Sequence, residues 1–117
     1  MKTMANSSRG SGVDDGPAAR KIESAAAFDR LRETVDTMLV DFYADWCGPC
    51  RLVADTVDAL AAESDVLVVK VDVETLPEVT REFGVNGIPA FVVFIDGEPA
   101  DRLVGMQDKS ELRRLTE

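Results

Sequence analysis

The chain has 117 residues, of which 45% are hydrophobic, so it is long enough for one domain with a buried core. Its 22 acidic and 13 basic residues give a formal net charge of -9, which argues against nucleic acid and anionic membrane surfaces as partners. No apolar run reaches the roughly 18 residues of a membrane span, and residues 1–20 lack the apolar segment of a signal peptide. We therefore expect a cytoplasmic protein without membrane contact. Separately, we expect it to be a monomer.

Residues 1–20 are predicted to form a disordered leader, and residues 21–117 a single folded domain. The leader is small and polar, rich in Ser and Gly, and has little to bury. In the domain, Ile22 marks the start of a short edge strand, and Ser24 is a candidate cap for the helix that follows. Three apolar residues of this helix recur at helical spacing, namely Ala27, Phe28 and Leu31.

Two apolar runs in the middle of the chain predict strands that are buried on both faces. The first extends over 38–44 and the second, rich in β-branched residues, over 66–73. Between them, a helix is expected over about 49–63, because its apolar residues recur at i, i+4, i+7 and i+8. These residues are Val53, Val57, Leu60 and Ala61.

The last third of the chain predicts a short helix, a hairpin and a final helix. Residues 75–78 have the form of a capping box that opens a helix ending near Gly84. Strands over 90–95 and 100–104 are joined by the turn signal Asp96-Gly97. Asp108 and Glu111 have capping-box spacing for a helix with Leu112 and Leu115 on one face.

This order of elements predicts an α/β fold. Alternating strands and helices build a parallel sheet, and the C-terminal hairpin adds antiparallel strands. The expected architecture is thus a central mixed β-sheet with helices on both faces.

The sequence Trp46-Cys47-Gly48-Pro49-Cys50 contains the only two cysteines. If Cys47 stands at the entrance of a helix and Cys50 one turn inside it, their Cα atoms lie about 5 Å apart, within disulfide range. The helix N-terminus favours a thiolate there, so Cys47 is the expected nucleophile and Cys50 the resolving thiol.

A closed zinc site is disfavoured, because it needs four ligands and the chain offers two cysteines and no histidine. A metal site shared between chains, or completed by carboxylates, remains as an alternative. In a reducing cytosol a lone cysteine pair is more often catalytic or metal-binding than structural.

Together, these features resemble the thioredoxin family over about 21–117. The resemblance rests on the cysteine motif after a buried strand, on Val40-Asp41-Phe42 before it, on Gly87-Ile88-Pro89 and on Gly105, in the family's order. It implies the thioredoxin fold and a thiol-disulfide oxidoreductase that reduces disulfides of target proteins. It further implies no bound cofactor, and regeneration by a separate thioredoxin reductase, usually a flavoprotein that uses NADPH.

The resemblance also assigns roles to two charged residues inside apolar strands. Asp41 would exchange a proton with Cys50 through water, and partial desolvation would raise its pKa toward neutrality. The alternative is a buried aspartate that only satisfies backbone groups. Lys70 interrupts the next strand, either facing Asp41 or extending from the strand to solvent.

Six residues are expected to bind the target segment. Ile88 would offer backbone hydrogen bonds beside a cis-Pro89, although an ordinary trans proline is the alternative. Trp46 could instead be a packing residue, and Gly105 a simple strand breaker. The full set is Trp46, Gly48, Pro49, Ile88, Pro89 and Gly105.

Other readings of the motif stay open. A disulfide isomerase or oxidase uses the same cysteine spacing, but the absent signal peptide and the Gly48-Pro49 pair favour a reductant. A non-catalytic interaction module could use the same apolar surface. One departure from the family pattern is Tyr43, which stands where many members carry a tryptophan and predicts a more polar pocket under the disulfide.

Overall fold

The computed structural model describes residues 19–117. The elements follow the predicted order: β1 (Arg20–Lys21), α1 (Ala25–Thr34), β2 (Thr37–Tyr43), α2 (Gly48–Glu63), β3 (Leu67–Asp72), α3 (Pro77–Glu82), β4 (Ala90–Ile95), β5 (Glu98–Val104) and α4 (Lys109–Thr116). The expected leader lies outside the described residues except for Ala19 and Arg20, and Arg20 already pairs with Val69.

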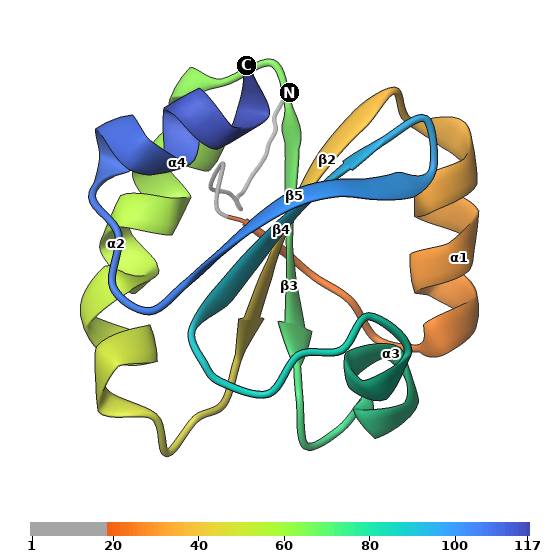
Figure 1. The fold of residues 1–117 in the computed structure, drawn as a ribbon, viewed down its shortest axis with the longest axis horizontal. Coiled ribbons are helices and arrows are strands. Elements are labelled where there is room, and N and C mark those ends of the chain that lie inside the picture. The colour runs from red at the N-terminus through yellow and green to blue at the C-terminus, as the bar shows by residue number, and fades with distance from the viewer. Residues whose placement is uncertain (1–18) are drawn as a thin grey trace, which may run out of the picture.

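The five strands form one mixed sheet in the order β1-β3-β2-β4-β5. Strands β1, β3 and β2 are parallel, whereas β4 is antiparallel to β2 and to β5. Helices α2 and α4 lie on one side of the sheet, and α1 and α3 on the other (Figure 1). The predicted architecture is therefore confirmed.

The two faces of the sheet bury separate apolar clusters, because side chains alternate along each strand. The α1/α3 face includes Val40, Phe42 and Val92, packed with Phe28 of α1. The α2/α4 face contains another set, namely Leu39, Val53, Val57, Leu60, Val68, Phe91, Val93 and Leu112.

Two helix caps match the sequence prediction. Ser24 Oγ accepts a hydrogen bond from Ala27 N–H at 3.1 Å, which caps α1. Asp108 and Glu111 form the reciprocal capping box of α4. Local side-chain chemistry thus defines where these helices begin.

The predicted capping box of α3 is wrong. Leu76, not Thr75, precedes the first helical residue, and it makes no side-chain cap bond. Thr75 Oγ1 instead donates to the carbonyl of Asp72 at 3.4 Å. Pro77 fixes the helix start one residue later than the spacing indicated, since its rigid φ suits the first helical position.

Strand boundaries also differ slightly from the prediction. The edge strand β1 precedes Ile22, although Ile22 N–H still donates to the carbonyl of Lys70 at 2.9 Å. Strand β5 begins at Glu98 rather than at Ala100, and the ladder with β4 contains an irregularity at Val93/Phe94. Pairing with β4 extends the strand through polar and proline residues that carry no strand pattern.

Candidate active site

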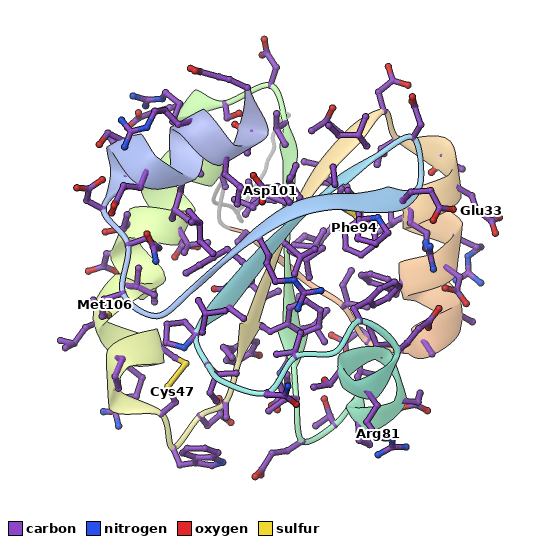
Figure 2. The ribbon with its side chains drawn as sticks, in the orientation of Figure 1. Glu33, Cys47, Arg81, Phe94, Asp101 and Met106 are labelled. Carbon is purple, nitrogen blue, oxygen red and sulfur yellow. A yellow bond between two sulfur atoms is a disulfide. The ribbon has the colours of Figure 1, made fainter. Side chains whose placement is uncertain are left out.

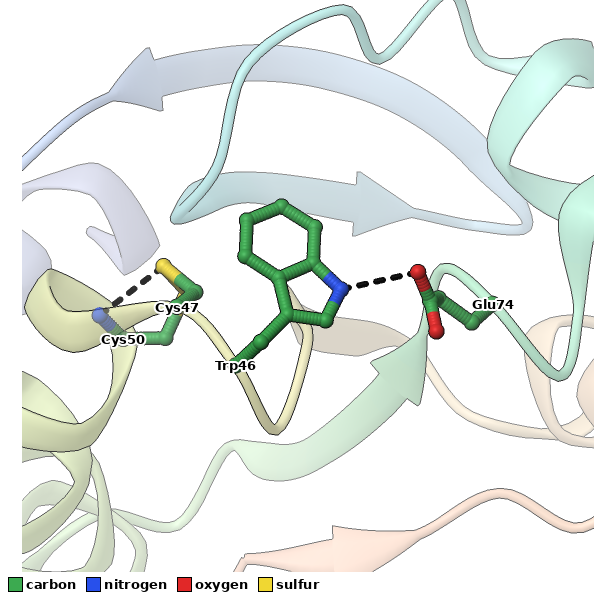
Figure 3. The surroundings of a disulfide bond; sticks show 4 residues. All are labelled: Trp46, Cys47, Cys50 and Glu74. Carbon is green, nitrogen blue, oxygen red and sulfur yellow. Dashed lines mark hydrogen bonds between the residues drawn. A yellow bond between two sulfur atoms is a disulfide. The ribbon is translucent and has the colours of Figure 1, made fainter.

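The two cysteines form a disulfide at the start of α2. Cys47 caps the helix, and Cys50 lies one turn inside it, with 5.3 Å between the two Cα atoms. The backbone N–H of Cys50 donates to Cys47 Sγ at 3.2 Å (Figure 3). The predicted helix-entry geometry is confirmed.

This geometry favours negative charge on Cys47. Its sulfur lies where the first N–H groups of the helix have no intrahelical partner, and one of them already points at it. Gly48 and Pro49 fill the first turn and are exposed, and proline costs nothing there because its missing N–H would have been unpaired. The first turn of α2 can therefore stabilise a thiolate.

The disulfide packs in a small apolar cluster at one end of the sheet. Cys47 and Cys50 are 4% and 5% exposed, and they cluster with Tyr43, Ala44 and the side chains of Val73 and Ile88. Figure 2 shows Cys47 in the lower part of the view, whereas the C terminus, labelled in Figure 1 in the same orientation, lies at the top. The fold thus brings Ile88 to the cysteines, although it lies 38 residues after Cys50 in the sequence.

The Ile88–Pro89 peptide bond is cis, as predicted. Pro89 is buried, and its carbonyl accepts a hydrogen bond from Gly105 N–H at 2.7 Å. Gly105 has φ +93, a conformation that side chains rarely adopt, so the backbone at this position favours glycine. The bond joins two of the predicted target-binding residues.

Trp46 is 66% exposed beside the disulfide, which argues against the alternative of a partly buried packing residue. Its indole Nε1–H donates to Glu74 Oε2 at 2.8 Å (Figure 3). The sequence analysis did not identify Glu74, because no local pattern links an indole to a carboxylate 28 residues away.

The sequence analysis also did not identify three exposed apolar side chains near the predicted site residues in the sequence. Leu52 is 76% exposed on α2, and Val104 and Met106, on either side of Gly105, are 58% and 51% exposed. A signal was present for Leu52, since it falls off the apolar stripe of its helix and so had to face outward.

Asp41 is buried in the middle of β2, with 1% of its surface exposed. Among the described residues its Oδ1 has no hydrogen-bond partner, which contradicts the alternative that it serves only to satisfy backbone groups. Burial raises the pKa of Asp41 to about 7, while the charge of Lys70 lowers it and that of Asp58 raises it. The carboxyl group can therefore gain and lose a proton near neutral pH, as predicted.

Lys70 is the direct neighbour of Asp41 across the β2–β3 pair. Its ammonium does not form an ion pair with Asp41 in the described part of the chain but lies 4.5 Å from the centroid of the Tyr43 ring. Lys70 thus faces Asp41 across the two strands, which is one of the two alternatives that the sequence left open, but its ammonium makes a cation–π contact with Tyr43.

Within residues 19–117, no group of three or more His, Cys, Asp or Glu side chains could hold a metal ion. Over the same residues, no helix has the length and apolar character needed to cross a membrane.

Comparison with known proteins identifies the family. The thioredoxin family model matches residues 20–117. The chain belongs to the thioredoxin family. A thioredoxin of Chlamydia caviae is 41% identical over 96 residues, covering 81% of this chain and 93% of that one. The solved structure of a mutant thioredoxin from Halobacterium salinarum has a TM-score of 0.82 and 36% identity, covering 91% and 94% of the two chains.

A longer relative also aligns with the chain. A protein of Mycobacterium leprae, named bifunctional thioredoxin reductase/thioredoxin, is 40% identical over 96 residues, which are 80% of this chain and 21% of that protein. Thioredoxins are protein-disulfide reductases that carry no bound cofactor, and this member of the family is a thiol-disulfide oxidoreductase with a redox-active cysteine pair.

Proposed function

We propose that the chain reduces protein disulfides with Cys47 as nucleophile and Cys50 as resolving thiol. The observation that carries this assignment is the position of Cys47 as the cap of α2, with its sulfur accepting the N–H of Cys50. The Cys47 thiolate attacks one sulfur of the target disulfide, a mixed disulfide forms, and one target thiolate leaves.

Resolution of the mixed disulfide uses the second thiol. Asp41 takes the proton of Cys50 through water, and the Cys50 thiolate then attacks Cys47 Sγ. The Cys47–Cys50 disulfide forms as the second target thiolate leaves, so two electrons pass from the dithiol to the target. The high pKa of Asp41, caused by burial, supports this role, and the charge of Lys70 lowers that pKa and so keeps it from rising further.

The target segment binds along the apolar surface around the disulfide, which is formed by Trp46, Gly48, Pro49, Ile88, Pro89 and Gly105. The exposure of Trp46 and the bond between Gly105 and Pro89 support a surface that an extended chain can approach. Leu52, Val104 and Met106 add exposed apolar area around the same site.

A thioredoxin reductase regenerates the dithiol, and it is a flavoprotein that draws electrons from NADPH. The name of the bifunctional Mycobacterium leprae relative supports a reductase partner. We further propose that the protein acts as a cytoplasmic monomer on disulfide-containing target proteins.

The reduction potential of the Cys47–Cys50 pair tests the direction of the reaction. Equilibration in graded dithiol/disulfide buffers should give a value near about -270 mV, whereas a value of about -180 to -120 mV would favour an isomerase or oxidase. A pair that does not cycle would leave the interaction module as the better explanation.

Separately, Cys50→Ser should accumulate a mixed disulfide with a target protein, and full-rate turnover by this variant would refute the two-thiol mechanism.

A further inference from the structure

Asp41, Tyr43 and Lys70 lie on the same face of the sheet. Asp41 and Tyr43 are two residues apart on β2, and Lys70 is opposite Asp41 on β3, so all three side chains point toward the α2/α4 side. The neighbours of Asp41 confirm this direction, since its antiparallel partner Phe91 belongs to the cluster on that face. The disulfide cluster, which includes Tyr43, lies at the end of these strands.

Lys70, the cation that lowers the pKa of Asp41, points toward the Tyr43 ring and makes no ion pair with Asp41 among the described residues. Lys70 Nζ lies 4.5 Å from the Tyr43 ring centroid, and Asp41 Oδ1 is buried without a hydrogen-bond partner among the described residues. A buried carboxylate and an ammonium on adjacent strands would ordinarily pair, because each otherwise loses solvation without compensation. The aromatic ring provides the competing site for the ammonium.

We propose that Tyr43 is a positioning residue, whose ring holds the Lys70 ammonium away from the Asp41 carboxyl group and so keeps that group able to accept and release a proton. Its consequence for catalysis rests on the proposed acid–base role of Asp41. The effect of Tyr43 on the pKa of Asp41 does not depend on that role. It adds to the mechanism a residue that acts on Asp41 through Lys70.

Several other charged groups act on Asp41 and Tyr43 or lie beside Lys70. Asp58 of α2 acts on Asp41 and raises its pKa. Burial is the largest cause of the raised pKa of Tyr43, and the carboxylates of Asp72, Asp45, Asp41 and Glu23 raise it further. On the edge strand β1, Lys21 is paired in register with Lys70. The Tyr43 hydroxyl is therefore neutral at physiological pH, and the ring acts through its face.

The sign of the effect follows from the position of the cation. When the ring is removed, Lys70 is free to approach Asp41, and a closer positive charge favours the ionised carboxylate. Loss of the ring should therefore lower the pKa of Asp41, in the direction opposite to the effect of burial.

The test is an NMR titration of the Asp41 carboxyl carbon in the oxidised full-length protein. In Tyr43→Leu the pKa of Asp41 should fall by about one pH unit or more, whereas Tyr43→Phe, which keeps the ring, should leave it close to the wild-type value. In Lys70→Met the pKa should rise, and adding Tyr43→Leu to Lys70→Met should then change little. The proposal would be overturned if Tyr43→Leu left the pKa of Asp41 unchanged. It would also be overturned if Tyr43→Leu lowered this pKa as much in the Lys70→Met protein as in the wild type.

A second variant keeps the test valid if Tyr43→Leu does not fold. A fluorinated phenylalanine at position 43 weakens the negative face of the ring with little change in shape, so relative to Tyr43→Phe it should also lower the pKa of Asp41. No difference between those two proteins would contradict the cation–π explanation.

The rate of disulfide reduction as a function of pH separates this inference from the proposed function. If the titration behaves as expected but Asp41→Asn leaves the pH profile unchanged, the acid–base role of Asp41 is wrong and the positioning by Tyr43 stands. If Asp41→Asn alters the profile and Tyr43→Leu does not move the pKa, the positioning is wrong and the proposed function stands.

Discussion

The two faces of the central sheet are built from the same strands but serve different purposes. Toward α1 and α3, the strands bury only apolar side chains around three aromatic rings, and the centroids of Phe83 and Phe94 are 4.9 Å apart. Toward α2 and α4, the same strands bury Asp41 and bring Lys70 opposite it, and the disulfide cluster lies at the end of β2. The period of two residues along a strand keeps the two environments separate.

The contrast explains how this small domain can tolerate a buried carboxyl group. The α1/α3 face supplies apolar burial that strongly favours the folded state. The α2/α4 face contributes less than it could, because Asp41 is buried with one oxygen that no described residue bonds. One face therefore mainly stabilises the fold, and the other buries a carboxyl group with a pKa of about 7, two residues before Tyr43 of the disulfide cluster.

The largest expected effect on stability comes from the aromatic face. Phe94→Ala should lower the free energy of unfolding by about 3–5 kcal/mol, because Phe94 is 1% exposed and contacts two other rings. Chemical denaturation measures the change. The neighbouring Ile95→Ala, at a residue that is 46% exposed, is the matched control and should cost much less. A large shift in the disulfide reduction potential of a folded Phe94→Ala protein would contradict the separation of the faces.

On the other face, Asp41→Asn should stabilise the protein at pH 8. The pKa of Asp41 is raised from 3.8 to about 7, so between these values the unfolded chain releases a proton that the folded chain retains. Stability should therefore fall as pH rises through this interval, by roughly 2–4 kcal/mol, and then level off. Denaturation midpoints at pH 4 to 8 measure the slope.

Asp41→Asn should remove most of that slope and slow disulfide reduction. Asp55→Asn, which removes an exposed carboxylate from α2, is the control and should leave the slope in place. If wild-type stability rose from pH 4 to 7, the assignment of a raised pKa to Asp41 would be wrong.

A smaller effect is expected at the start of α1, which covers the aromatic face. Ser24→Ala removes the hydrogen bond from Ala27 N–H and should lower stability by about 1 kcal/mol. Thermal unfolding measures the loss, and Ser24→Asn, which keeps an acceptor at the cap, should largely preserve the melting temperature. Equal destabilisation by both variants would mean that the cap itself contributes nothing.

The smallest effect tests whether the aromatic face also supports the active site. Arg102 Nη2 donates to the carbonyl of Phe83 at 2.6 Å and Nη1 to that of Gly84 at 3.4 Å, just before the segment that carries Ile88 and Pro89. Arg102→Gln should raise KM for a protein disulfide by about two- to fivefold, with kcat little changed.

The control for this variant is Arg81→Gln, which removes a positive charge from an exposed position on α3. An equal rise in KM in both variants would point to net charge rather than to the bonds of Arg102. No change in either variant would show that the segment keeps its conformation without Arg102.

Much of the candidate site could be predicted because its signals are local. The helix entry at Cys47 follows from two cysteines three residues apart, and the buried state of Asp41 follows from its place in a continuous apolar run. The partners of these residues could not be predicted in the same way. Glu74 reaches Trp46 across 28 positions, and the choice of Lys70 between Asp41 and the Tyr43 ring depends on side-chain packing.

Local patterns in the chain were enough to establish the order of the elements, the mixed sheet and the cysteine pair at the start of a helix, because hydrophobic period and motif spacing act over a few residues. Packing in three dimensions was needed to assign partners to the polar groups: Thr75 bonds to Asp72 and does not cap α3, Lys70 contacts Tyr43, and Asp41 Oδ1 finds no partner among the described residues. These outcomes depend on competition among groups that folding brings together. No periodic pattern in the sequence indicates which partner a polar group takes.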